Sequence, residues 1–355
     1  MKTIRIHGDT GDSTIVVGEV LESLGKYAPL ERTVVITDTN VRRHYQKDFP
    51  PCEVVEIGTG EKVKTLERVR EIYQRLTEIE ADRSSFIVGI GGGVVCDIAG
   101  FVASTYMRGV DFGFVSTTLL SQVDASVGGK NGVNLGGYKN MVGVFNQPKF
   151  VICDMNLLKT LPERELLSGF GEIVKHATIE DPRLFSYLEE NYEKALKLDL
   201  QVIKRLVSDS IVIKSSVVNR DEKETGERRK LNFGHTFGHA IEKTTGISHG
   251  EAVSAGMVIA SKLSRQMGYL SIEEAEKIVT LLKNLKLACP IQIAHSGVLD
   301  ALKKDKKRNG SSIYFVLLRA IGEAVVEKIS INTLEAAMGD FIVNDTGISE
   351  GKNEP

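Results

Sequence analysis

The chain has 355 residues, of which 42% are hydrophobic and 26% are charged, and its formal net charge is -2. This length and composition suit about two folded domains and exclude a disordered chain. A near-neutral charge also excludes a global basic field of the kind that attracts nucleic acid or an anionic membrane.

The sequence carries no signal of export or of membrane insertion. The N-terminal stretch has no apolar core followed by small residues, and no apolar run reaches the ~18 residues that span a bilayer. Cys52, Cys96, Cys153 and Cys289 are scattered and share no short metal-binding spacing. We therefore expect a cytoplasmic protein whose cysteines are reduced.

The first part of the chain alternates strand-like and helix-like segments. Residues 33–38 (TVVITD), 52–58 (CEVVEIG), 85–93 (SFIVGIGGG), 112–118 (FGFVSTT) and 149–154 (KFVICD) read as buried strands. Between them, residues 62–79 place apolar side chains at helical spacing. Such alternation predicts a parallel α/β sheet.

After about residue 154 the pattern becomes mostly helical. Helical periodicity runs through residues 161–179, 201–219, 234–245, 250–267 and 272–285. Residues 312–329 are the exception and predict a small hairpin around Ile321 and Gly322. We predict an α/β domain over residues 1–158, a mostly α-helical domain over 159–343 and a polar tail over 344–355.

A glycine-rich turn follows the strand at residues 85–93. Gly89, Gly91, Gly92 and Gly93 precede a predicted helix, where backbone N–H groups can approach a pyrophosphate. The match to GxGxxG is imperfect, because Val94 takes the sixth position, and a tight strand–helix turn explains the glycines equally well. Asp38, at the end of an earlier strand, is either a ribose ligand or a turn residue.

Residues 116–148 read as a loop rich in lysine and asparagine. Polar side chains are spaced there by Gly-Gly pairs, and Arg108 precedes them; they are Asp124, Lys130, Asn131, Asn134, Lys139 and Asn140. Lysine and asparagine on glycine-rich turns can bind phosphate and hydroxyl oxygens. The alternative is a surface loop without a ligand.

Histidines and a glutamate on three Gly-flanked segments suggest a metal site. His235 and His239 stand one helical turn apart, His249 opens another helix, and Glu172 precedes Lys175 and His176 on a third. One carboxylate with two or three imidazoles matches a catalytic zinc site. The HExxH pattern of zinc proteases is excluded, because Thr236 stands where it needs a glutamate. Each histidine by itself has a structural explanation.

In this order, these motifs resemble the 3-dehydroquinate synthase family of the sugar-phosphate cyclases. The resemblance extends to about residue 330 and rests on GGGVVCDIAGFVASTYMRG, STTLLSQVDASVGGKNGVN, GGYKNMVGVFNQP, LPERELLSGFGEIVKHA, DEKETGERRKLNFGHTFGHAIE and HGEAV. It implies an α/β NAD-binding domain followed by a helical metal-binding domain. It also implies a homodimer that acts on a small molecule, with no nucleic-acid or membrane partner.

The resemblance assigns a role to each group of residues. It implies that Glu172, His235 and His249 bind zinc or cobalt, although spacing alone favours His235 and His239 as the ligand pair. It places around the substrate Arg108, Asp124, Lys130, Lys139, Asn140, Lys175, Lys214, Arg228, Asn232, His239 and Lys307, with Lys306 a competing register. Around NAD it places Asp38, Asn40, Glu61, Lys64, Gly92, Gly93, Val94, Asp97, Thr117, Thr118, Lys130, Lys139, Thr160, Leu161 and Glu165. Leu157 departs from the family, since many relatives have phenylalanine there.

The implied reaction belongs to the shikimate pathway. A phosphorus–oxygen lyase of this family converts 3-deoxy-D-arabino-heptulosonate 7-phosphate to 3-dehydroquinate and phosphate. The family chemistry is oxidation by NAD, β-elimination of phosphate, return of the hydride and an intramolecular aldol closure. The alternatives are another sugar-phosphate cyclase, a metal-dependent polyol dehydrogenase, and a metabolite or zinc sensor without catalysis.

Overall fold

The computed structural model of the protein describes residues 1–287, 308–309 and 312–336. Two compact units emerge, the first formed by Met1–His176 with Arg183–Arg228 and the second by Ala177–Pro182 with Arg229–Pro355. The predicted boundary at residue 158 follows the change from strands to helices and stays a prediction. The predicted tail at 344–355 lies outside the described residues. No helix within the described ranges is long and apolar enough to cross a bilayer.

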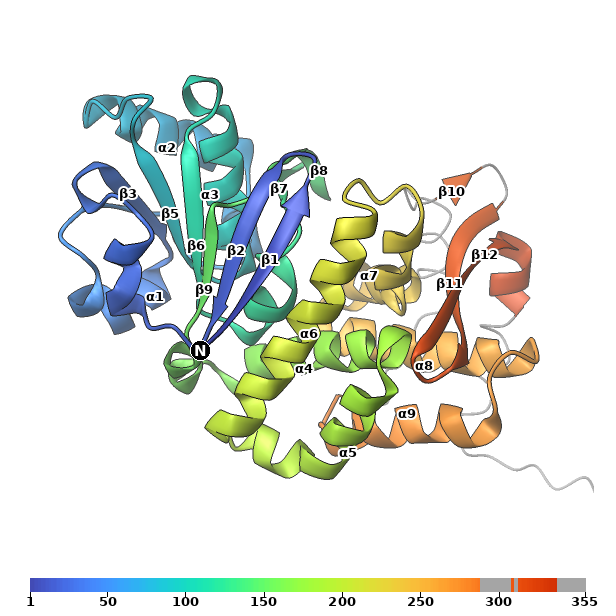
Figure 1. The fold of residues 1–355 in the computed structure, drawn as a ribbon. Helices are drawn as coiled ribbons and strands as arrows, with labels where there is room; N and C mark the ends of the chain where they lie inside the picture. The colour runs from blue at the N-terminus through green and yellow to red at the C-terminus, as the bar shows by residue number, and fades with distance from the viewer. Residues whose placement is uncertain (288–307, 310–311, 337–355) are drawn as a thin grey trace, which may run out of the picture. The chain divides into compact units, whose positions relative to one another are not determined.

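A seven-stranded sheet in the order β1-β2-β9-β6-β5-β3-β4 forms the centre of the first unit (Figure 1). The strands are β1 (Lys2–Gly8), β2 (Gly11–Val17), β3 (Thr33–Thr37), β4 (Glu53–Glu56), β5 (Phe86–Gly91), β6 (Asp111–Ser116) and β9 (Phe150–Cys153). All neighbouring pairs are parallel except β1 with β2. The predicted α/β sheet is thus confirmed, while the N-terminal antiparallel hairpin was not predicted.

Both faces of the central strands are buried, as a parallel sheet requires. On one face, Phe86, Val88 and Ile90 of β5 join a core cluster with residues that include Leu157. On the other face lies α3 (Gly93–Thr105), and a Cβ added at Gly89 would stand 3.0 Å from the Cβ of Ala99. The glycine therefore permits close contact between strand and helix.

The remaining elements of the first unit surround this sheet. The helices are α1 (Thr39–Tyr45), α2 (Leu66–Glu78), α4 (Glu163–Glu180), α5 (Pro182–Leu196) and α6 (Leu200–Arg220), and α6 runs alongside β1 and β2 (Figure 1). The last residues of α4 belong to the second unit. The stretch predicted as a lysine- and asparagine-rich loop is instead ordered into a π-helical turn, η6 (Ser121–Ala125), and the hairpin β7 (Lys130–Leu135) and β8 (Tyr138–Phe145). Lysines, asparagines and glycines on an exposed strand conceal its alternation.

The second unit consists mainly of helices. It contains α7 (His235–Thr245), α8 (His249–Gln266) and α9 (Ile272–Asn284), with β10 (Arg308–Asn309), β11 (Ser312–Ala320) and β12 (Glu323–Ser330). The predicted hairpin is confirmed: β11 pairs antiparallel with β12, and Gly322 at its turn has φ +93°. Helices α7 and α8 approach closely, because a Cβ at Gly256 would lie 1.9 Å from the backbone oxygen of Gly234.

Candidate functional site

The carboxyl ends of β3 and β5 flank a topological switch point in the sheet. The chain leaves β3 toward β4 on one side and leaves β5 toward β6 on the other. In open α/β sheets, ligands bind in the crevice at such a point. Asp38 directly follows β3, and Gly92 directly follows β5. The two ambiguous sequence signals therefore meet at the place where a nucleotide is expected.

The glycine turn presents the N-terminus of α3 at this crevice. Gly92 is the N-cap residue and has φ -79°, so its backbone is ordinary. A Cβ at Gly92 would stand 2.9 Å from Cγ2 of Thr118, and one at Gly93 would stand 3.0 Å from Cβ of Ala125. Close approach, and not positive φ, is what these glycines provide. A helix of 13 residues supplies a positive dipole end and N–H donors for a phosphate.

Asp38 is committed to its own helix. Its carboxylate accepts hydrogen bonds from the backbone N–H groups of Asn40 at 2.8 Å and Val41 at 3.0 Å, which caps α1. Burial raises the pKa of this carboxyl, and those two bonds oppose the rise. The N-cap role does not exclude a ligand, because the second carboxylate oxygen makes neither of these bonds.

A second polar network joins the turn before α2 to the β7–β8 hairpin. Lys64, which is buried, contacts the carboxylate of Asp97 on α3 and donates to Oδ1 of Asn140 at 2.5 Å. Burial raises the pKa of Asp97, and the Lys64 ammonium opposes that rise. Asn134 donates to Oε1 of Glu61 at 2.7 Å. Lys64, predicted to bind the nucleotide, thus contacts Asn140, predicted to bind the substrate.

The other predicted nucleotide residues occupy neighbouring ends of the same sheet. Thr117 and Thr118 follow β6, and Thr160 ends the helical turn η7 (Met155–Thr160) that follows β9. The Thr160 hydroxyl lies 2.7 Å from that of Tyr45. The remaining predicted residues lie in or next to these elements: Asn40 is in α1, Val94 is in α3, Leu161 follows η7, and Glu165 is in the first turn of α4.

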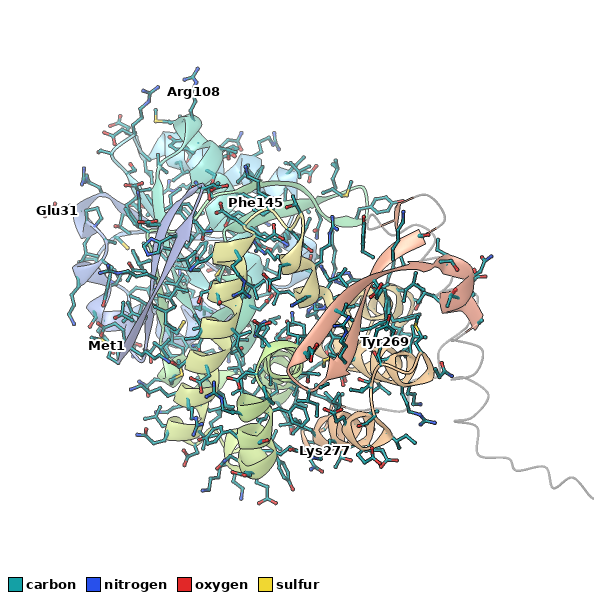
Figure 2. The ribbon with its side chains drawn as sticks, turned by 45° about the vertical axis from the view of Figure 1, so that its right-hand side comes forward. Met1, Glu31, Arg108, Phe145, Tyr269 and Lys277 are labelled. Carbon is teal, nitrogen blue, oxygen red and sulfur yellow. The ribbon has the colours of Figure 1, made fainter. Side chains whose placement is uncertain are left out.

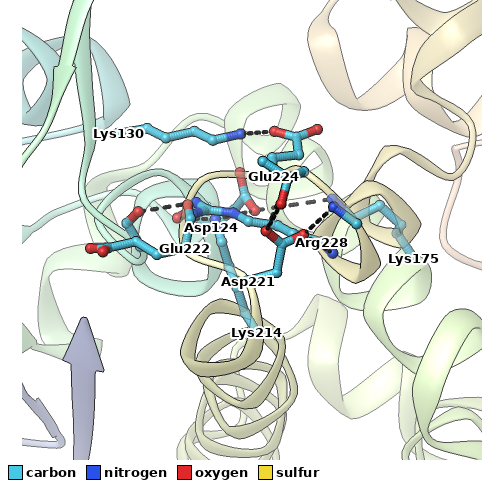
Figure 3. A network of polar contacts seen from close by, with 11 residues as sticks. Asp124, Lys130, Lys175, Lys214, Asp221, Glu222, Glu224 and Arg228 are labelled. Carbon is cyan, nitrogen blue, oxygen red and sulfur yellow. Dashed lines mark hydrogen bonds and ion pairs between the residues drawn. The ribbon is translucent and has the colours of Figure 1, made fainter. Parts of the chain in front are cut away.

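Four cations of the first unit belong to one polar network, and we call Lys130, Lys175, Lys214 and Arg228 the cationic cluster (Figure 3). Lys130 joins this network through Glu224. Lys214 of α6 donates to both Oδ1 and the backbone oxygen of Asp124, each at 2.6 Å. Lys175 of α4 lies 4.0 Å from the same Oδ1 and contacts Glu172. These cations come from four separate elements and meet only in the fold.

Burial and charge act against one another in the cationic cluster. Burial lowers the pKa of Lys214 from 10.5 to about 8, even though Asp124 opposes the change. Burial would raise the pKa of Asp124, but Lys214 and Lys175 outweigh it and hold the carboxyl ionised. Burial lowers the pKa of His176 to about 3, so its imidazole is neutral near pH 7. The cluster therefore holds the buried side chains of Lys175 and Lys214 beside an ionised carboxylate.

Acidic residues just before Arg228 hold its backbone and its guanidinium. Oδ2 of Asp221 accepts from the backbone N–H of Gly226 at 2.7 Å and of Arg228 at 3.0 Å. The Arg228 side chain donates to the backbone oxygens of Glu222 and of Gly128, the latter at 3.0 Å. Glu224, with φ +59°, contacts Lys130 (Figure 3).

No role was predicted for these acidic residues from the sequence. The available signal was the run DEKETGER, in which an aspartate precedes a glycine by five residues and an arginine by seven. That arrangement is typical of a side chain that folds back on the following backbone.

Arg108 does not join the cationic cluster. It ends η5 (Tyr106–Arg108), at the opposite end of α3 from Gly93. A helix of 13 residues is about 20 Å long. The side chain is exposed, and Figure 2 shows Arg108 pointing outward at the edge of the first unit. This exposed position does not support a substrate contact, and the role of Arg108 stays a prediction. Lys307 and its alternative Lys306 lie outside the described residues.

Three histidines cluster in the second unit. The ring centroids of His235 and His249 are 5.4 Å apart, and that of His239 lies 5.2 Å from His235. His235 opens α7 after Gly234, whose φ is +77°. Ser248 and Glu251 form a reciprocal capping box, which fixes the helix start at His249. Two helix starts therefore set the positions of these rings.

Hydrogen bonds at Nδ1 orient two of the rings. Nδ1 of His235 lies 3.2 Å from the backbone oxygen of Phe233, and Nδ1 of His249 lies 3.4 Å from Oε2 of Glu242. A carbonyl or carboxylate at Nδ1 places the proton there and makes Nε2 the nitrogen that can bind a metal. His239 is exposed. The donor chemistry of His235 and His249 thus fits a metal site.

Family models match most of the chain. Residues 54–168 match the 3-dehydroquinate synthase N-terminal model, and residues 169–308 match the 3-dehydroquinate synthase C-terminal model. The chain is 41% identical over 349 residues to the 3-dehydroquinate synthase of Alkaliphilus metalliredigens, which covers 95% of this chain and 98% of that protein. The chain belongs to the 3-dehydroquinate synthase family.

Solved structures agree with this membership. The 2-deoxy-scyllo-inosose synthase complexed with carbaglucose-6-phosphate, NAD+ and Co2+ is 26% identical, with a TM-score of 0.86 over 96% of this chain and all of that one. The 2-epi-5-epi-valiolone synthase ValA from Streptomyces hygroscopicus subsp. jinggangensis 5008, with NAD+ and Zn2+ bound, is 25% identical, with a TM-score of 0.86 over 97% of this chain and all of that one. The predicted family, fold class and type of enzyme are confirmed, and the chain is an enzyme of the 3-dehydroquinate synthase type.

Proposed function

We propose that this member of the 3-dehydroquinate synthase family converts 3-deoxy-D-arabino-heptulosonate 7-phosphate to 3-dehydroquinate and phosphate. The observation that carries the proposal is the cationic cluster, in which Lys175, Lys214 and Arg228 are buried although the chain has a net charge of -2. A substrate with a dianionic phosphate and a carboxylate matches that charge. Family membership indicates the type of reaction, and the cationic cluster explains how the anionic substrate is recognised.

The cationic cluster binds the two anionic groups of the substrate. Arg228 suits the carboxylate, because a guanidinium offers two parallel donors to one planar group. Lys130 and Lys214 act as point charges for phosphate and hydroxyl oxygens, and Asp124 keeps Lys214 in place by the bonds at 2.6 Å. Further substrate contacts proposed from the family pattern are Arg108, Lys139, Asn140, Lys175, Asn232, His239 and Lys307.

NAD binds in the crevice between the carboxyl ends of β3 and β5. Gly92 and Gly93 give its pyrophosphate access to the N–H groups that open α3, and Asp38 accepts from a ribose hydroxyl. The nucleotide supplies a reversible hydride acceptor. Lys64 and Asp97 form an ion pair close to the hairpin that holds Lys139 and Asn140. The pair connects the nucleotide-binding residues to this substrate-binding hairpin without adding net charge.

A divalent metal, zinc or cobalt, is held by Glu172, His235 and His249. The three side chains offer one carboxylate oxygen and two imidazole nitrogens, a set found in catalytic zinc sites with an open position. The metal supplies a Lewis acid beside the reacting hydroxyl. Glu242 and the backbone of Phe233 orient the two imidazoles.

A competing donor set exists within the first unit. Asp124, Glu172 and His176 offer ligand atoms within 4.8 Å of one another. However, Oδ1 of Asp124 already accepts from the ammonium of Lys214 at 2.6 Å and has that of Lys175 at 4.0 Å. Lys214 also donates to the backbone oxygen of Asp124, so Asp124 is committed to holding the cationic cluster.

We propose a cytoplasmic homodimer as the working form, following the family pattern. The two related solved structures, a 2-deoxy-scyllo-inosose synthase and a 2-epi-5-epi-valiolone synthase at 25–26% identity, favour another sugar-phosphate cyclase as the second candidate function. The 41% identity to a curated 3-dehydroquinate synthase outweighs them. A polyol dehydrogenase has no need of the cationic cluster.

Phosphate release tests the proposal. Purified protein loaded with zinc and catalytic NAD is given the heptulosonate phosphate, and phosphate and absorbance at 340 nm are followed together. We expect phosphate far in excess of NAD and no lasting NADH. Lasting NADH would indicate a dehydrogenase. Release only from hexose or other heptulose phosphates would indicate another cyclase, and binding without turnover would indicate a sensor.

A further inference from the structure

We propose that Asn134 is a positioning residue that joins the nucleotide-binding side of the first unit to the substrate-binding turn of the β7–β8 hairpin. This role rests on the proposed function and differs from the direct binding of phosphate or hydroxyl oxygens that the loop composition suggested. It contacts neither ligand in the proposal. It acts on Glu61 and Lys64 on one side and on Asn140 on the other.

Asn134 leaves the ladder of its own hairpin. The register of β7 with β8 shifts between Val133 and Leu135. Asn134 alone lies between these paired positions of β7, opposite residues 139–141 of β8, so the extra residues of the bulge are on β8 and Asn134 faces them. Its backbone N–H donates instead to the backbone oxygen of Lys64 at 2.9 Å, and it forms a parallel bridge with Thr65. Bulges near functional sites redirect a side chain. The backbone of Asn134, opposite the bulge, attaches the hairpin to the segment that carries Glu61 and Lys64.

The side-chain amide uses both of its ends. Nδ2 donates to Oε1 of Glu61 at 2.7 Å, and Oδ1 accepts from the backbone N–H of Asn140 at 2.9 Å. Asn140 has φ +53°, so its backbone is held in the left-handed region. Oδ1 of Asn140 then accepts from Lys64 at 2.5 Å, which closes a ring of contacts through Lys64, Asn134 and Asn140.

No other side chain of this size provides both functions. Aspartate keeps the acceptor for Asn140 but places a negative charge against Glu61. Leucine has a similar volume and neither function. Because one amide holds both sides, a nucleotide that orders Glu61 and Lys64 also orders the turn that carries Lys139 and Asn140. Coupling of this kind is reciprocal, so each ligand tightens the binding of the other.

Two substitutions separate the two ends of the amide. We measure the Kd of NADH by fluorescence titration and the KM and kcat for the heptulosonate phosphate, using metal-loaded full-length protein. Asn134→Leu should raise both the Kd and the KM roughly five- to tenfold, the effect of one hydrogen bond on each side. Asn134→Asp should raise the Kd of NADH by at least about tenfold and the KM by less, because only the bond to Asn140 survives.

A matched control and a rescue exclude a general structural effect. Leu135 is 51% exposed and adjacent in the same turn, so Leu135→Ala should leave both constants within about twofold of the wild type. Adding Glu61→Gln to Asn134→Asp reverses the polarity of their bond, and the double variant should bind NADH more tightly than Asn134→Asp alone. Such non-additivity identifies direct contact between the two side chains.

The proposal is overturned if Asn134→Leu changes the Kd and the KM no more than Leu135→Ala does. It is also overturned if the double variant is no better than the sum of its single changes. The NADH titrations need no turnover. A wild-type protein that releases no phosphate would therefore contradict the proposed function while leaving the bond between Asn134 and Glu61 open to measurement.

Discussion

The pKa of Lys214 predicts a loss of activity at high pH. Burial lowers this pKa from 10.5 to about 8, Asp124 raises it, and the nearby cations Arg228 and Lys175 lower it. The profile of kcat/KM against pH reports ionisations of the free enzyme. We expect kcat/KM to fall about tenfold per pH unit above about pH 8, as Lys214 loses the charge that binds the anionic substrate.

Asp124→Asn should move this fall to lower pH. Lys214 donates to Oδ1 of Asp124 at 2.6 Å, and asparagine keeps the size of the side chain but removes its charge. A hydrogen bond to a charged group contributes about 1.5–3 kcal/mol. At about 1.4 kcal/mol per pKa unit, the midpoint should shift down by roughly one to two units. The direction is fixed, because the carboxylate favours the protonated lysine.

The assay is phosphate release over roughly pH 6–9.5, with thermal unfolding measured at each pH. Lys214→Arg is the control, since a guanidinium keeps its charge throughout this range and the fall should disappear. The unfolded chain holds the Lys214 proton more tightly than the folded one, so this group adds stability as pH rises from about 8 toward 10.5. Deprotonation of Lys214 therefore does not destabilise the fold at high pH, and unfolding from this cause cannot explain the fall in kcat/KM. A midpoint that stays in place or rises in Asp124→Asn would refute the reasoning.

Four further substitutions address the other parts of the site. Glu172→Ala and His235→Ala should each lose most of the bound metal and the activity while keeping the far-UV circular dichroism; a variant that retains both zinc and turnover contradicts the metal assignment. Gly92→Val should raise the Kd of NAD at least about tenfold, because its Cβ meets Thr118 at 2.9 Å in the nucleotide crevice; unchanged affinity in a titration places the pyrophosphate elsewhere. Lys130→Met should lower kcat/KM between about ten- and a hundredfold with unchanged zinc content, and a loss of metal instead would show a structural role.

Local signals in the sequence were reliable where neighbours in the chain decide the structure. The strand that ends at Gly91, the helix start after Gly92 and the capped start of α8 at His249 all depend on residues within one or two turns. The hairpin around Gly322 is equally local. Family membership was also readable, because its motifs preserve residue type and order.

The β7–β8 hairpin shows where local reasoning failed. Its strands are rich in lysine, asparagine and glycine, and β8 is mostly exposed, so no apolar alternation marks them. Opposite the bulge of β8, Asn134 donates its backbone N–H to the segment at Lys64 and Thr65, about seventy residues earlier, and pairs with it. No window of the sequence around Asn134 contains that partner.

The sequence by itself determined the family, the strand and helix pattern and the residue types of the site. Only the tertiary structure decided which charges neutralise one another. Lys214 and Asp124 are 90 residues apart, yet their contact at 2.6 Å keeps the lysine charged near neutral pH and the carboxyl ionised. Arg108, by contrast, follows α3 to the opposite end of that helix from Gly93. The physical reason is that pKa values depend on burial and on distances between charges, and both are set by packing between segments remote in the chain.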